Sequence, residues 1–154
     1  MKLAITIALA IVSLPCLAQS PGKAEVFPAA QIKGHFVELA PRAMANGSSG
    51  TTLGDYGSHA LKLNERTTSG GAEIHAHFDD VFLVMEGKAT LITGGEIIDP
   101  HAESNGETTG SGLRNGTVQP ILAGDVVHIP AGTPHQLLIA PGTTYSALVI
   151  KVKE

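Results

Sequence analysis

Two histidines separated by one residue form the pattern in this chain that is best suited to chemistry. His75 and His77 lie among small and apolar residues in the segment 71–87, and Asp80 follows shortly after them. Side chains two residues apart on a strand point to the same face, roughly 7 Å from each other. Imidazole nitrogens and a carboxylate in this arrangement can converge on one divalent metal ion. We therefore interpret His75, His77 and Asp80 as candidate metal ligands.

A second segment, residues 124–136, would supply a further nitrogen ligand. Its residues follow the pattern Gly-x5-Pro-x-Gly-x2-His, which is occupied by Gly124, Pro130, Gly132 and His135. Proline and glycine at this spacing are typical of a tight turn. Such a turn would deliver His135 at the start of the next strand.

Together, the two segments resemble the paired signature motifs of the cupin superfamily, and the resemblance covers residues 70–139. It implies an all-β fold, the double-stranded β-helix or jelly-roll barrel, with a small-molecule or metal site inside. His75, His77, Asp80 and His135 would then hold one divalent metal. Mn, Fe, Ni and Zn all suit such a mixed set of ligands.

The first motif departs from the usual cupin pattern in the position of its carboxylate. Counting back from Gly87 places Asp80 where a Glu is usual, and only two residues separate His77 from Asp80. Either the loop is shorter by one residue, or the register shifts to Glu73-x-His75-x4-Asp80. His75 is a ligand in both registers, whereas Glu73 replaces His77 in the second.

A metal-free barrel is the alternative interpretation of the same residues. In it, His75, His77 and His135 would be interior polar groups that hydrogen-bond to one another or to water. We favour metal binding, because inward-facing histidines without a partner are costly in a dry barrel. The other histidines are expected to have packing or surface roles, namely His35, His59 and His128, while His101 lies in a long polar segment.

Short stretches rich in Val, Ile, Leu and Thr, bounded by turn residues, indicate eight strands. They are predicted at residues 59–65, 72–77, 81–85, 88–98, 117–122, 126–129, 135–140 and 144–152. Strands at this spacing, without helical crossovers between them, favour an all-β sandwich or barrel. The barrel is expected to occupy residues 58–154.

Residues 19–57 are expected to precede the barrel as a short helix and a linker. Pro28 could open the helix, Ile32, Phe36 and Leu39 give it an apolar stripe, and Pro41 is expected to end it. The Gly- and Ser-rich residues 46–57 are predicted to form the linker. A second polar stretch, residues 99–116, is predicted to be either a flexible excursion or a lid over a pocket.

The first 18 residues have the layout of a secretory signal peptide. Lys2 precedes an apolar stretch from Leu3 to Leu14, which is shorter than the roughly 20 residues of a membrane-spanning helix. Cys16 and Ala18 are the small residues that signal peptidase requires, so we expect cleavage after Ala18. The mature protein would be secreted or periplasmic, without a membrane association and without its only cysteine.

Composition excludes several classes of partner. Ten Lys and Arg residues against 14 Asp and Glu residues give a net charge of −4, so no basic field attracts nucleic acid. No phosphate-binding loop, dinucleotide fingerprint or acyl-enzyme motif occurs. A small molecule is the expected partner, with a homodimer as an open possibility.

The sequence thus predicts an exported metal-binding cupin that acts on a small molecule. The alternative is a non-catalytic or metal-free binding barrel, and the sequence does not decide whether the protein is an enzyme.

Overall fold

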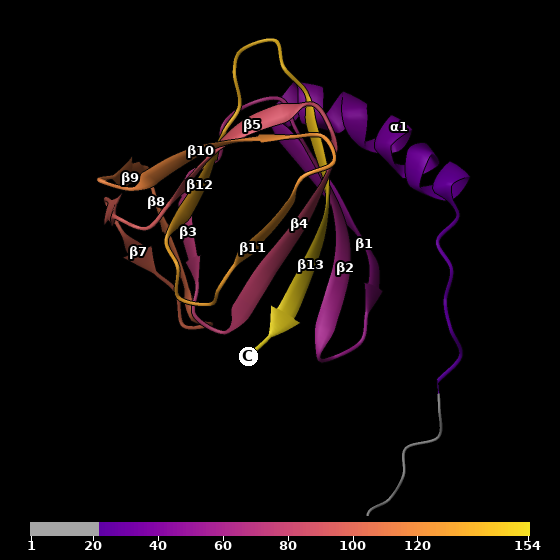
Figure 1. The fold of residues 1–154 in the computed structure, drawn as a ribbon, viewed down its shortest axis with the longest axis horizontal. Coiled ribbons are helices and arrows are strands. Elements are labelled where there is room, and N and C mark those ends of the chain that lie inside the picture. Colours follow the sequence, from indigo (N-terminus) through magenta and orange to yellow (C-terminus); the bar gives the residue numbers. More distant parts are fainter. Residues whose placement is uncertain (1–21) are drawn as a thin grey trace, which may run out of the picture.

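The computed structural model describes residues 22–154, which form two large antiparallel β-sheets, a small third sheet and one helix outside them (Figure 1). The predicted signal peptide, residues 1–18, lies outside the described residues. The first sheet has the order β1-β2-β13-β4-β11, with β1 at Ser48–Asp55, β2 at His59–Arg66, β13 at Tyr145–Lys153, β4 at Phe78–Glu86 and β11 at Val126–Ile129.

The second sheet faces the first and closes the barrel. Its order is β10-β5-β12-β3-β8-β7, with β10 at Thr117–Leu122, β5 at Lys88–Thr93, β12 at His135–Leu138, β3 at Ala72–His75, β8 at Glu107–Gly110 and β7 at His101–Ala102. A small two-stranded sheet pairs β6 at Glu96–Ile98 with β9 at Gly112–Arg114. The predicted all-β barrel is therefore confirmed.

The core of the barrel lies between the inner faces of the two sheets. Alternate residues on each strand contribute to it, as the two-residue period of a strand requires. On β4 these residues are Phe82 and Val84, and on β5 they are Ala89 and Leu91, all buried. The same alternation places Asp80 on the inner face of β4, two residues before Phe82.

Most of the segment 46–57 forms strand β1 of the barrel, so the prediction of a linker there was wrong. Strand β1 pairs with β2 along its length, from Ser48 opposite Arg66 to Asp55 opposite Ala60. Composition misled the prediction, because small polar residues are poor strand formers by themselves. An edge strand needs only one partner, and the backbone of β2 supplies its hydrogen bonds.

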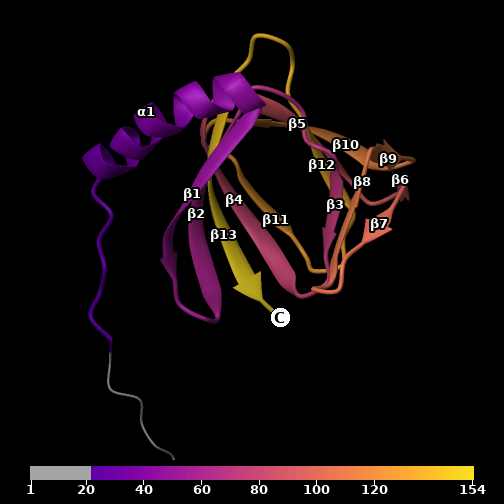
Figure 2. The same ribbon diagram turned by 180° about the vertical axis from the view of Figure 1, so that it is seen from behind.

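The helix α1 spans Ala29–Asn46 and is longer than expected, since Pro41 lies inside it. Proline removes one backbone hydrogen bond, but the turns on both sides are stabilised by burial of Leu39 and Ala43. The helix ends at Gly47, whose φ of 84° and N–H bond to the Ala43 carbonyl form the C-terminal cap. Figure 2 shows α1 lying across β1 and β2, outside the barrel as predicted.

The polar segment 99–116 is folded, contrary to the expectation of a flexible loop or a lid. It contains β7, β8 and β9, and β8 pairs with β3 from Ala72 opposite Gly110 to His75 opposite Glu107. Pairing with β3 satisfies the backbone of a stretch whose side chains alone gave no strand signal. No helix within residues 22–154 combines the length and apolar character that crossing a membrane would require.

Candidate metal centre

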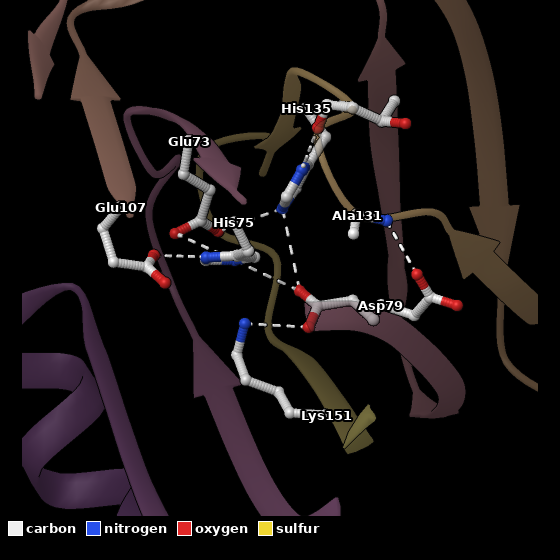
Figure 3. Close-up of polar contacts among 9 residues, drawn as sticks. Glu73, His75, Asp79, Glu107, Ala131, His135 and Lys151 are labelled. Atoms are coloured by element: carbon white, nitrogen blue, oxygen red, sulfur yellow. Dashed lines mark hydrogen bonds and ion pairs between the residues drawn. The ribbon is translucent and has the colours of Figure 1, made fainter. Parts of the chain in front are cut away.

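Three potential metal ligands come together because of the pairing of β3 with β12. Glu73 lies directly opposite His135 in the register, and His75 follows Glu73 on the same face of β3. One ligand atom from each of these residues lies within 4.8 Å of the others. Figure 3 shows the three side chains pointing toward one another. The two rings are 5.2 Å apart, tilted rather than stacked.

Each histidine is held through its Nδ1 atom, which leaves Nε2 facing the centre. His75 Nδ1 contacts the carboxylate of Glu107, and His135 Nδ1 lies 3.0 Å from the carbonyl oxygen of Thr133. An acceptor at Nδ1 fixes that nitrogen as the proton donor and leaves the lone pair of Nε2 free. Metal-binding histidines are oriented in this way by carboxylates and backbone carbonyls. The geometry thus presents two imidazole lone pairs to one point.

Asp80 approaches the same point from the opposite sheet. Its Oδ2 atom lies 3.4 Å from His75 Nε2 and 3.7 Å from His135 Nε2. Its Oδ1 atom lies 2.8 Å from the ammonium nitrogen of Lys151, which is the residue opposite Asp80 in the pairing of β13 with β4. Asp80 is therefore shared between the histidines and a lysine.

The pKa values of these residues show how strongly the charges interact. Burial would raise the pKa of Glu73, but contacts with His135 and the positive charges of His75 and Arg66 lower it overall. Burial likewise opposes ionisation of Asp80, yet His75 and Lys151 hold the pKa of its carboxyl below the usual range. The pKa of His75 is raised: burial acts against this, and the carboxylates of Asp80 and Glu107 outweigh it.

The structure does not bring His77 into this group. β3 ends at His75, and His77 lies exposed in the following turn, where it packs against Gly106. The turn breaks the two-residue alternation, so His75 and His77 do not share a face. The placement of His77 was wrong, and the arrangement follows the alternative register in which Glu73 and His75 are the pair on β3. His75, Asp80 and His135 lie together as expected.

The turn of the second motif is tied to the strand that carries His75. The N–H of Gly132 donates to the carbonyl oxygen of His75 at 2.9 Å, and Gly132 has a φ of 76°, a left-handed conformation. Asp79 accepts a hydrogen bond from the N–H of Ala131 at 2.7 Å (Figure 3). These bonds fix the position of His135, which follows the turn.

The remaining histidines lie away from the centre, as their expected packing and surface roles imply. His128 contacts Asp79 at 3.0 Å, His59 stacks on Tyr56, and His35 lies 3.9 Å from Glu38. His101 is exposed on the short strand β7.

Sequence reasoning missed two residues of the site, Glu107 and Lys151. Glu107 comes from the segment 99–116, and no sequence pattern indicated that this segment pairs with β3. Lys151 could have been found, because it continues the inward alternation of Tyr145, Ala147 and Val149 on β13. A lysine on the inner face of a barrel strand signals a charged partner inside.

The centre opens into a cavity of about 490 Å³ on the inner face of the first sheet. This volume lies in the usual range for small-molecule sites. Glu73, His75, Asp80 and Lys151 line one part of the cavity, while Arg66 and Tyr145 also lie along its wall. The candidate ligands thus adjoin a space that a small molecule could enter.

Comparison with solved structures places this barrel among known folds. A cupin domain from Schizosaccharomyces pombe is 12% identical, with a TM-score of 0.54 over 71% of this chain and 66% of that one. The polyketide cyclase RemF from Streptomyces resistomycificus is 20% identical, with a TM-score of 0.51 over 71% of this chain and 67% of that one. The chain has the cupin fold.

A further similar structure is that of an enzyme with a longer chain. Recombinant oxalate oxidase, solved in complex with glycolate, is 17% identical with a TM-score of 0.51; the match covers 70% of this chain and about half of the oxidase, 52%. No protein-family model and no curated protein matches the sequence. The likeness concerns the cupin barrel, and the chemistry has to be argued from the residues of this chain.

The donor set fits a divalent metal. Two neutral imidazoles and one carboxylate are ligands that Fe, Mn, Ni and Zn accept, and three protein ligands leave coordination positions open. The Nε2 atom of His135 is buried without a hydrogen-bond partner among residues 22–154. A buried nitrogen lone pair without a donor is costly, and a bound cation would satisfy it.

Proposed function

We propose that this protein binds one divalent metal through Glu73, His75 and His135 and acts on a small molecule in the adjoining cavity. The observation that carries the proposal is the orientation of the two histidines, whose Nδ1 atoms are both occupied while both Nε2 atoms face Glu73. The cupin fold supports it, since similar barrels include enzymes.

The metal would act as a Lewis acid toward a substrate group in the cavity. The protein's own contribution is positional. Glu107 and the Thr133 carbonyl hold the imidazoles in one tautomer, and the Gly132 N–H ties the turn to β3. Asp80 lies 3.4 Å from His75 Nε2 and can accept a hydrogen bond from a molecule beside the centre.

A second candidate function is a metal-free binding barrel. It is favoured by one observation, the ammonium group of Lys151 at 2.8 Å from Asp80. This internal cation already neutralises part of the negative charge that would attract a metal. In such a protein Glu73, Asp80 and the histidines would form a hydrogen-bonding site for a polar ligand.

Metal analysis distinguishes the two functions. We expect the purified protein to contain a transition metal, or to bind Mn, Fe, Ni or Zn after treatment with a chelator. His135→Ala should weaken metal binding at least about tenfold, because the metal loses one of three ligands. Isothermal titration with each metal measures the affinity.

His77→Ala is the matched control, since His77 is a neighbouring but exposed histidine outside the centre. The affinity of the His77→Ala variant for metal should equal that of the unaltered protein. If His77→Ala abolishes binding while His135→Ala does not, the proposed ligand set is wrong. If neither the unaltered protein nor any variant binds metal, the metal-free barrel becomes the better account.

We also propose that this function is carried out outside the cytoplasm, in a secreted or periplasmic protein. The proposal rests on the sequence of residues 1–18 alone. The intact mass of the protein prepared for metal analysis reports whether the chain is cleaved after Ala18.

A further inference from the structure

The cavity carries a positive end that the metal centre does not use. Arg66 on β2 and Tyr145 on β13 are directly opposite each other in the strand pairing, and both line the cavity. Paired residues of neighbouring strands present their side chains on the same face of a sheet. The guanidinium of Arg66 and the hydroxyl of Tyr145 therefore belong to the same inner face as Lys151.

Arg66 forms no ion pair within residues 22–154, although its charge reaches Glu73 and lowers the pKa of that carboxyl. The cavity is also lined by the carboxylates of Glu73 and Asp80, but Asp80 is paired with Lys151, and Glu73 lies beside the two histidines. Among residues 22–154, no carboxylate oxygen lies within 4.0 Å of the half-buried Arg66 guanidinium. A guanidinium offers two parallel N–H donors that match the two oxygens of a carboxylate.

Tyr145 lacks a hydrogen-bond partner as well. Its side chain is 1% exposed, and its hydroxyl makes no hydrogen bond within residues 22–154. Burial raises the pKa of Tyr145 to about 12, so the hydroxyl keeps its proton and remains a donor. An acceptor bound beside Arg66 would give this hydroxyl the partner that it lacks.

The wall between this end and the metal centre is apolar. Phe82 and Val149 are opposite each other on β4 and β13, and Leu137 on β12 faces them from the other sheet; all three line the cavity. A ligand that fits this space has an anionic group at one end and an apolar body. Its other end would reach Glu73, His75 and Asp80.

We propose that the cavity binds a small organic acid whose carboxylate is held by Arg66, with Tyr145 as a second donor, and whose apolar body lies against Phe82, Val149 and Leu137. The proposal deepens the proposed function, because it names the substrate class of the same cavity. Arg66 lies outside the proposed ligand set of Glu73, His75 and His135, so acid binding can be measured apart from metal binding.

The test compares acids with their neutral amides. Three acids are titrated into chelator-treated protein and into protein loaded with Zn: acetate, hexanoate and benzoate. Each acid is compared with its own amide, which is acetamide, hexanamide or benzamide, respectively. We expect at least one acid to bind with or without metal, and its amide to bind about tenfold more weakly or less well. Arg66→Gln should weaken binding of the acid about tenfold or more and leave the amide unchanged. Arg42→Gln, which removes an exposed arginine of α1, is the control.

A second variant moves the guanidinium without removing its charge. A Cβ atom at Gly70 would lie 2.8 Å from Nη1 of Arg66. Gly70→Ala should therefore displace the flexible end of Arg66, at little cost in stability, and weaken acid binding. This variant keeps the test valid even if Arg66→Gln folds poorly.

Several results would overturn the proposal. These are the absence of binding for all three acids, equal affinity for acid and amide, or unchanged acid affinity in both Arg66→Gln and Gly70→Ala. Acid binding that requires Zn and ignores Arg66 would also overturn it. Failure of the metal proposal gives a different pattern: no Zn uptake, but acid binding that still depends on Arg66.

Discussion

Lys151 and Asp80 form an ion pair beside the proposed metal centre. The ammonium group lies 2.8 Å from one oxygen of Asp80, while the other oxygen lies 3.4 Å from His75. A metal ion beside the histidines would experience repulsion from this ammonium group. Asp80 would also be less available as a ligand, because it is already ion-paired with Lys151. In the proposed metal site, Lys151 would therefore lower the affinity for the metal.

Replacing Lys151 by Met should raise the affinity for a divalent metal at least about tenfold, which corresponds to roughly 1.4 kcal/mol. The same change leaves Asp80 without its buried partner, so the metal-free protein should unfold at a lower temperature. Isothermal titration and thermal unfolding, with and without Zn, measure both effects. Lys153→Met, at an exposed position of the same strand, should change neither. Weaker metal binding in Lys151→Met would show that Lys151 supports the centre.

The sequence predicted part of this centre, and the reasons differ residue by residue. His135 follows a Pro-x-Gly turn, and His75 is a candidate ligand in both registers, so the local pattern was enough to place these two residues together. The choice between Glu73 and His77 depends on where β3 ends. That end is set by the turn at Ala76 and His77, whose N–H and carbonyl groups bond to Gly106 and Glu154. Residues so distant in the chain could not be identified from local sequence.

At the scale of elements, strands bounded by turn residues were predicted best. β10 and β11 have the predicted ends, at Thr117–Leu122 and Val126–Ile129. β1 and β8 were missed, because their side chains carry no strand pattern and each is held by the backbone of a neighbour. Helix α1 passes Pro41 because buried contacts on both sides outweigh one lost hydrogen bond. Tertiary pairing overrides local propensity in each of these cases.

The turn from β4 to β5 is a single glycine, and its replacement should be costly. Gly87 has a φ of 77°, and an added Cβ atom would lie 1.9 Å from the backbone oxygen of Thr144. We expect Gly87→Ala to lower the free energy of unfolding by about 2 kcal/mol or more, because strain and a backbone collision add up. Denaturation by urea measures the loss.

Gly124→Ala separates the two causes of this stability loss, namely backbone strain and the collision of the added Cβ atom. Gly124 also has a positive φ, 95°, but an added Cβ atom would meet nothing within 4 Å. This variant should lose only the part due to backbone strain, and therefore less stability than Gly87→Ala. Equal losses in the two variants would show that the collision with Thr144 is relieved at no cost.

At the scale of the whole molecule, a buried carboxyl should make stability depend on pH. Burial and the nearby negative charge of Glu86 raise the pKa of Glu65 above its ordinary value of 4.5. The folded protein thus keeps a proton that the unfolded chain releases. The stability from this group is fully present below pH 4.5 and is lost as the pH rises through the higher folded pKa.

Glu65→Gln should therefore stabilise the protein at pH 7 to 8, with the gain shrinking toward zero near pH 4. Thermal unfolding across this range, compared with the unaltered protein, measures the effect. Glu103→Gln, at an exposed site, should give no such trend. A loss of stability in Glu65→Gln at pH 8 would show that the charged carboxylate has a stabilising partner.

The position of β13 has a consequence for how the molecule can be made. Among the strands of residues 22–154, β13 comes last in the sequence, yet it occupies the middle of the first sheet, between β2 and β4, and carries Tyr145 and Lys151. Until residue 153 has left the ribosome, β2 and β4 have no strand to join them, and their inner faces stay open. Native contacts between strands so distant in sequence form slowly. The first sheet can therefore close only after β13 has been synthesised, and until then the half of the cavity that β2 and β4 contribute stays incomplete.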